Sequence, residues 1–175
     1  MEGAGERMAR ALVEALGLAP LWPEGGYYRT VYRSAQTTGG RSLLGAIYYL
    51  LGAGEYSRMH RLDTDEVYHF FAGDAVEMLL LWPDGRGERV VLGGERAAGQ
   101  LPQVTAPAGC WQGARLLPGG AWALMATTTT PAFSRAGYTH GEKAALTDAW
   151  PEHAELIAQL ADEPEENARK ESRMV

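Results

Sequence analysis

The chain has 175 residues, of which 46% are hydrophobic, 22% are charged and 9% are aromatic. This length and composition indicate one globular domain with a single core and exclude a disordered or fibrous protein. The formal net charge of −6, from 16 basic and 22 acidic residues, argues against a nucleic-acid partner. The single cysteine, Cys110, excludes an intrachain disulfide and a cysteine-rich zinc site, and it fits a reducing compartment.

The N-terminal segment predicts neither export nor membrane insertion. Residues 1–20 carry Glu2, Glu6 and Glu14 among their apolar residues, which a secretory signal peptide does not do. The most apolar run, residues 43–51, has less than half of the roughly 20 residues that a membrane-spanning helix needs. We therefore expect a cytoplasmic protein with no membrane partner.

The first elements in chain order are a helix and a strand. Residues 1–17 are predicted to contain a helix, which Gly17 can end in a left-handed conformation. The helical spacing comes from Met8, Ala11, Leu12, Ala15 and Leu16. Residues 22–26 (WPEGG) are typical of a turn, and residues 27–33 (YYRTVYR) are rich in the aromatic and β-branched residues that favour strands.

Most of the remaining chain has the period of strands. Between residues 41 and 130, about eight short apolar or alternating runs are separated by turns rich in glycine and proline, as in a β-sandwich or barrel. No interval has a helical pattern of about 10 to 15 residues, which disfavours a parallel βαβ sheet. Residues 151–160 begin with proline and predict a second helix. We therefore divide the chain into the helix of residues 1–17, a barrel with its closing helix at 18–161, and a charged tail at 162–175.

Strand alternation predicts which side chains share a face, because residues two apart on a strand point the same way. Arg58 and His60 share one face, as do Glu66 and Tyr68 on the next strand. Gln112 belongs to an inward set with Ala114 and Leu116, which leaves Trp111 on the reverse side. The strand at residues 44–51 has two sets, and the sequence does not say which of them faces inward: Ala46, Tyr48 and Leu50, or Ile47, Tyr49 and Leu51.

Five sequence blocks occur in this order: Pro23–Arg29, His60–Arg61, Asp65–Asp74, Gly99–Gln103 and Pro107–Gln112. Together they resemble the cupin-5 family, formerly a domain of unknown function within the cupin superfamily, over about residues 18–160. The resemblance implies an all-β fold, the cupin double-stranded β-helix, with the predicted helices at either end. It also implies a ligand in the mouth of the barrel and often a homodimer.

The resemblance departs from the cupin pattern at the metal-binding positions. Cupins that hold a metal use several histidines and a glutamate, and the matching positions here are His60, Glu66 and Gln112. A second histidine is missing, and a neutral glutamine oxygen is a poor substitute for imidazole. We therefore expect no cofactor; if a metal is bound, these three residues would hold it. Family members also usually begin the first block with histidine, where this chain has Trp22.

The first functional hypothesis is a metal-independent epimerase or isomerase that acts on a carbohydrate-like substrate, by analogy with metal-free cupins that epimerise nucleotide-linked sugars. His60 would act as the base, because an imidazole titrates near neutral pH. Tyr48 or Tyr28 would return the proton on the other side, and Arg58 would stabilise the enolate.

The second hypothesis is a non-catalytic protein that binds a small polar molecule, and the third is a metal-dependent oxygenase or isomerase. The expected ligand-binding residues are Arg58, Glu66, Gln112, Tyr28 and Tyr68. Purely structural roles stay open: a backbone carbonyl can satisfy His60, an ion pair Glu66, and a hydrogen bond across the barrel Gln112. Turn chemistry explains residues 24–26, and the aromatic run at residues 27–32 is explained by core or dimer-interface packing.

Overall fold

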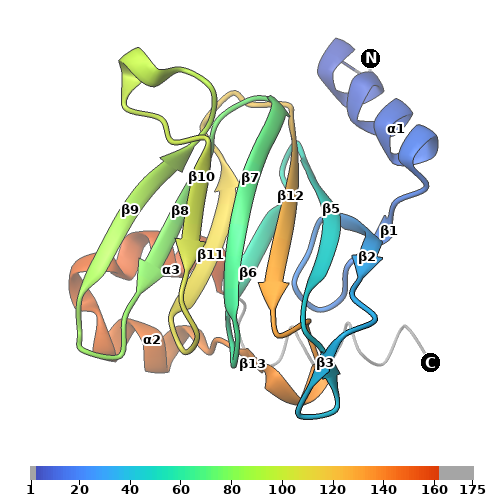
Figure 1. The fold of residues 1–175 in the computed structure, drawn as a ribbon. Coiled ribbons are helices and arrows are strands. Elements are labelled where there is room, and N and C mark those ends of the chain that lie inside the picture. Colours follow the sequence, from blue (N-terminus) through green and yellow to red (C-terminus); the bar gives the residue numbers. More distant parts are fainter. Residues whose placement is uncertain (1–2, 162–175) are drawn as a thin grey trace, which may run out of the picture.

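The computed structural model describes residues 3–161, and two antiparallel sheets that face each other form most of it (Figure 1). One sheet has six strands in the order β1 (Ala19–Pro20), β2 (Tyr27–Arg33), β5 (Gly45–Gly52), β12 (Trp122–Thr130), β7 (Asp65–Gly73) and β10 (Gln103–Ala106). The other has five strands in the order β13 (Tyr138–His140), β6 (Tyr56–Leu62), β11 (Trp111–Leu116), β8 (Val76–Leu81) and β9 (Gly87–Leu92). A small hairpin joins β3 (Thr37–Thr38) to β4 (Arg41–Ser42). The predicted all-β fold is confirmed.

Helices lie at both ends of the described chain. The first, α1 (Ala4–Leu16), stops at Gly17, whose φ of 61° is left-handed as predicted. Near the other end, α2 (Lys143–Ala149) and α3 (Ala154–Leu160) lie beyond the five-stranded sheet (Figure 1). The sequence analysis missed α2, and the predicted helix at 151–160 starts with a 3₁₀ turn, η3 (Pro151–His153). Two more 3₁₀ turns are η1 (Arg96–Ala98) and η2 (Arg135–Gly137).

The core between the sheets decides which side chains face inward. Tyr49 and Leu51 of β5 lie in this core together with Tyr68 of β7 and Ala114 of β11. Of the two sets on β5, the inward one is therefore Ile47, Tyr49 and Leu51, and Tyr48 points outward. A second apolar cluster lies on the outer face of the five-stranded sheet, where α3 packs; it comprises Met59, Leu79, Leu81, Leu146, Trp150, Leu156, Ile157, Leu160 and Ala161.

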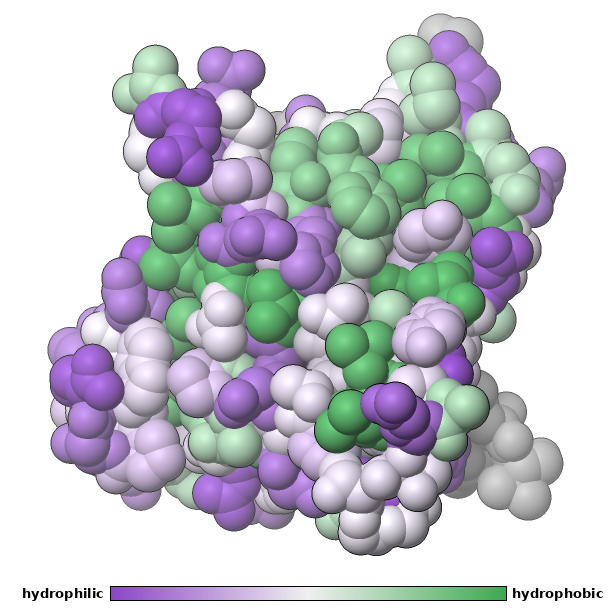
Figure 2. Space-filling view, in the orientation of Figure 1, coloured by the Kyte–Doolittle hydropathy of each residue, from purple (hydrophilic) through white to green (hydrophobic). Residues whose placement is uncertain are grey.

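The outer face of the six-stranded sheet carries apolar side chains beside α1. Figure 2 shows hydrophobic residues gathered over β5, β12 and the neighbouring helix. On this face the ring of Tyr48 contacts Phe71 edge-on, with 6.3 Å between centroids, and the guanidinium of Arg29 lies 5.6 Å from the centre of the Tyr48 ring. Among residues 3–161, no helix is both long and apolar enough to cross a membrane. The predicted charged tail, residues 162–175, lies outside the described residues.

Pairing between strands brings the predicted site residues to one end of the barrel. His60 of β6 pairs directly with Gln112 of β11, and Glu66 lies at the start of β7, which follows β6 along the chain. The loop before β2 folds against the same strand, because the backbone N–H of Arg58 donates to the Glu24 carbonyl at 2.8 Å. Gly25 allows this approach: its φ is 108°, and a Cβ there would collide with the Tyr56 carbonyl oxygen.

Candidate functional site

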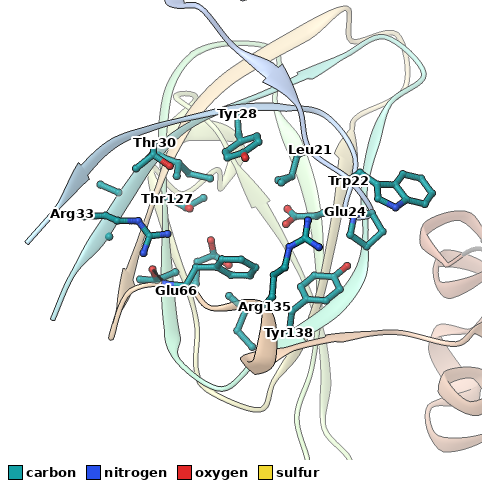
Figure 3. A pocket seen from close by; sticks show the side chains of 17 residues that line it. Leu21, Trp22, Glu24, Tyr28, Thr30, Arg33, Glu66, Thr127, Arg135 and Tyr138 are labelled. Atoms are coloured by element: carbon teal, nitrogen blue, oxygen red, sulfur yellow. Dashed lines mark hydrogen bonds between the residues drawn. The ribbon is translucent and has the colours of Figure 1, made fainter. Parts of the chain in front are cut away.

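A cavity of about 440 Å³ lies at this end of the barrel, a volume within the roughly 300–1,000 Å³ of small-molecule sites (Figure 3). Its walls come from the loop before β2, from strands β2, β5, β6, β7 and β12, and from the segment that leads into β13 together with the first residue of that strand. Four charged side chains line it, namely Glu24, Arg33, Glu66 and Arg135. The other labelled side chains are Leu21, Trp22, Tyr28, Thr30, Thr127 and Tyr138 (Figure 3). The cavity thus offers charged, hydroxyl-bearing and aromatic surfaces to one ligand.

Glu24 is a cavity carboxyl whose environment strongly favours its protonated form. Its side chain is 16% exposed, and its Oε1 accepts a hydrogen bond of 3.0 Å from the Ser57 hydroxyl. Burial raises the pKa of Glu24 to about 7, and hydrogen bonds from Ser57 and Tyr49 lower it less. A carboxyl with such a pKa can both take and give a proton near neutral pH.

Glu66 is a second, deeper carboxyl. It is 6% exposed, and its Oε2 accepts hydrogen bonds from the amide nitrogen of Gln112 at 2.8 Å and from the Tyr68 hydroxyl at 3.5 Å. Burial raises the pKa of Glu66, and the charge of Glu24 raises it further; His60, Thr127 and Gln112 act in the opposite direction. The negative charge of Glu24 therefore opposes the ionisation of Glu66, and the two carboxyls titrate as a pair.

His60 lies behind these carboxyls and does not line the cavity. The residue is 1% exposed, and its ring stacks on Tyr138 with 5.3 Å between centroids. Its Nδ1 donates to the Arg58 carbonyl at 2.7 Å, which leaves the Nε2 lone pair 3.8 Å from Oε2 of Glu24. Burial lowers the pKa of His60, which favours the neutral ring.

The predicted site residues separate into two groups. His60, Glu66 and Gln112 come together, as the family resemblance implied, with Tyr68 beside Glu66, and Tyr28 lines the cavity. Their predicted roles in catalysis and binding stay predictions.

Arg58 and Tyr48 lie elsewhere. The guanidinium of Arg58 is 3.4 Å from the carbonyl oxygens of Pro23 and Glu24, and 5.8 Å from the centre of the Trp22 ring, so it supports the loop that carries Glu24. Tyr48 is on the outer face of β5, because the inward positions belong to its neighbours on either side. The structure therefore does not bring either side chain to the cavity as the sequence analysis expected.

Four further residues line the cavity that the sequence did not point to: Glu24, Arg33, Arg135 and Tyr138. A signal for Glu24 existed, since it belongs to the first block of the family resemblance, but turn chemistry explained it equally well. Arg135 lies in the 3₁₀ turn η2 and Tyr138 at the start of the three-residue strand β13, and both elements are too short for a periodicity that predicts direction. Only the fold brings that segment to the mouth of the barrel.

Comparison with known proteins identifies the family. A model of the cupin superfamily family Cupin_5 (DUF985) matches residues 10–140. The chain belongs to the cupin-5 family. This cupin-5 protein is 30% identical to a protein of known structure from Shewanella oneidensis, with a TM-score of 0.82 and coverage of 93% of this chain and 99% of that one. A hypothetical protein from Leishmania major is also 30% identical, with a TM-score of 0.81 and coverage of 89% and 99%.

More distant likenesses show the fold of the cupin-5 protein alone. Oxalate decarboxylase from Bacillus subtilis is 16% identical, with a TM-score of 0.54, and the match covers 83% of this chain and 37% of that one. The search of curated proteins gave no match. The predicted family and fold are therefore confirmed, and no relative supplies a function.

The residues aligned with cupin metal ligands do not fit a transition metal in this cupin-5 protein. Oxalate decarboxylase has Mn(II) centres. Here Gln112 turns its amide nitrogen toward Glu66, and its oxygen is buried without a hydrogen-bond partner. Within residues 3–161, no three histidine, cysteine, aspartate or glutamate side chains are grouped so that they could hold a metal ion. The chemistry proposed below therefore uses side chains alone.

Proposed function

We propose that this protein binds a small polar, carbohydrate-like molecule in the barrel cavity and acts on it as a metal-independent epimerase or isomerase. The observation that carries the proposal is Glu24, a cavity carboxyl whose pKa is about 7. No arginine or lysine among residues 3–161 forms an ion pair with it; its nearest basic group is the neutral His60 ring, 3.8 Å away. A buried carboxyl without a cationic partner is costly to the fold, and such groups concentrate at functional sites.

Glu24 takes the role of the base that the sequence analysis gave to His60. A base must reach the proton that it removes, and His60 is 1% exposed and lies outside the cavity lining. Glu24 lines the cavity, and Nε2 of His60 lies 3.8 Å from Oε2 of its carboxyl. His60 is therefore a positioning residue, whose neutral ring supports the carboxyl from outside the cavity.

The proposed step moves a proton from carbon to Glu24. Glu24 in its ionised form takes the proton from the carbon next to a carbonyl group, and the C–H electron pair becomes the enolate. The Tyr28 hydroxyl, on another wall of the cavity (Figure 3), gives a proton to the opposite face of that carbon. Exchange with water then restores both groups. The sugar carbon is inverted, and no oxidant or reductant is consumed.

A second candidate, a non-catalytic binding protein, is favoured by the burial of His60 and Gln112. Both residues are 1% exposed, and both are engaged in hydrogen bonds with neighbouring protein groups. In this case Glu24 and Glu66 would accept hydrogen bonds from ligand hydroxyls without proton transfer.

Solvent deuterium exchange separates the two candidates. We would incubate the protein in D₂O with keto and aldo sugars that have a proton next to the carbonyl and follow the loss of that proton signal by NMR. The epimerase proposal expects exchange with the wild-type protein and with Glu88→Gln, a matched change on the exposed strand β9, but none with Glu24→Gln. Binding without exchange would establish the second candidate, and exchange that survives in Glu24→Gln would overturn the assigned role.

A further inference from the structure

Two arginine side chains line the cavity and have no role in the proposed proton transfer. Arg33 comes from the end of β2, and Arg135 from the 3₁₀ turn η2 before β13. Both line the cavity, and Figure 3 shows both guanidinium groups turned toward its interior. Two residues about a hundred positions apart in the sequence thus bring their charges to one ligand-sized space.

Neither guanidinium has an acidic partner among residues 3–161. Other arginines of the chain do: Arg41 pairs with Asp63 and Arg115 with Glu77, each at 2.8 Å. Glu24 and Glu66 line the same cavity, yet neither forms an ion pair with Arg33 or Arg135. Within residues 3–161 both exposed guanidinium groups are therefore outside ion pairs, and an anionic ligand can bind them.

We propose that the ligand is anionic, a sugar-like molecule with a carboxylate or phosphate group that binds between Arg33 and Arg135, while its hydroxyl-bearing part reaches Glu24. This inference rests on the proposed function and specifies its substrate class. Guanidinium groups present parallel N–H donors that match the oxygens of carboxylates and phosphates. The chain as a whole has a net charge of −6, so the general surface does not attract anions, and binding of an anion depends on these two arginines.

The wall beside the arginines suits the ring of such a ligand. Phe133 and Tyr138 line the cavity on either side of Arg135 in the sequence, and their rings meet edge-on with 6.4 Å between centroids. Phe133 is 38% exposed although it is a large apolar side chain. An aromatic surface of this kind packs against the C–H face of a sugar ring, which leaves the hydroxyls free to bond with the threonines and carboxyls.

The test is a titration followed by residue-resolved NMR with four probes: glucose, glucuronate, glucose 6-phosphate and inorganic phosphate. The variants are Arg33→Gln and Arg135→Gln, with Arg89→Gln on the exposed strand β9 as the matched control. We expect the anionic sugars to bind more tightly than glucose, and each cavity variant to weaken their binding about tenfold. Arg89→Gln and the binding of glucose should not change. The tighter of glucuronate and glucose 6-phosphate identifies the anionic group.

The outcomes separate this inference from the proposed function. Glucose binding as tightly as the anionic sugars, or cavity variants that bind them as the wild type does, would overturn the anionic ligand and leave the proposed function standing. Arginine-dependent binding without signal changes at Glu24 and Thr127 would support an anion site and contradict the proposed function. No binding of any probe at millimolar concentration would overturn the inference.

Discussion

Replacing Glu24 by glutamine should stabilise the folded protein, and more strongly as the pH rises. Burial raises the pKa of this carboxyl from its ordinary 4.5 to about 7, so the folded protein binds the proton more tightly than the unfolded chain does. A raised acid pKa means that stability falls as the pH rises between these two values, because ionisation is easier in the unfolded chain. Glutamine keeps an oxygen for the Ser57 hydrogen bond and never carries a charge.

The size of the effect follows from the pKa. A rise from 4.5 to about 7 corresponds to about 3 kcal/mol in the free energy of unfolding at pH 8, and to almost nothing at pH 4, where the carboxyl is protonated in both states. Glu66 adds to the change, because its own pKa falls when the charge at Glu24 is removed. We therefore expect Glu24→Gln to be more stable than the wild type at pH 8 by about 3 kcal/mol or more.

Urea unfolding at several pH values measures this difference, with Glu88→Gln as the control for a glutamate-to-glutamine change on the surface. The control should follow the wild type at every pH. A Glu24→Gln protein that is no more stable than the wild type at pH 8, or whose advantage does not grow between pH 5 and pH 8, would refute the argument that an unpaired buried carboxyl lies in this cavity.

Three further predictions follow from the same geometry. Ser57→Ala removes a hydrogen bond that lowers the pKa of Glu24, so the pH midpoint of deuterium exchange should move upward; an unchanged or lower midpoint would contradict the contact. Gly25→Ala should destabilise the protein to urea by about 2 kcal/mol or more, because φ is 108° and the new Cβ meets the Tyr56 carbonyl; equal stability would contradict this turn. The family resemblance also leads us to expect a homodimer, and Tyr32 on β2, which is 55% exposed, offers apolar surface for it. Light scattering should then give a mass near twice 19.0 kDa, and a mass near 19 kDa would exclude a dimer.

Strand alternation correctly predicted which side chains of two strands face the core. Alternation along β7 and β11 predicts Glu66 on one face with Tyr68 and Gln112 on one face with Ala114, because side chains on a strand alternate between two faces. The same rule could not decide β5, whose two faces are both largely apolar. Tyr48 was chosen as a catalytic residue from the set that proved to face outward.

Loop residues escaped prediction for a different reason. The orientation of the Glu24 side chain depends on the turn at Gly25, which packs against β6. The orientation of Arg135 depends on the 3₁₀ turn η2. Neither segment has a repeating hydrophobic pattern, so the sequence does not predict where these two side chains point. The sequence does not give burial depth, and it is burial that places His60 behind a carboxyl and outside the cavity lining.

The most direct test of the proposed site is the titration of the Glu24 carboxyl itself, followed by carbon-13 NMR of protein labelled at glutamate side chains and assigned with Glu24→Gln. Burial in the cavity predicts a midpoint at about pH 7, with a second, weaker response as Glu66 titrates. A midpoint near the ordinary value of 4.5 would mean that water or a cation compensates the charge, and it would contradict Glu24 as the proton-exchanging group of this cavity.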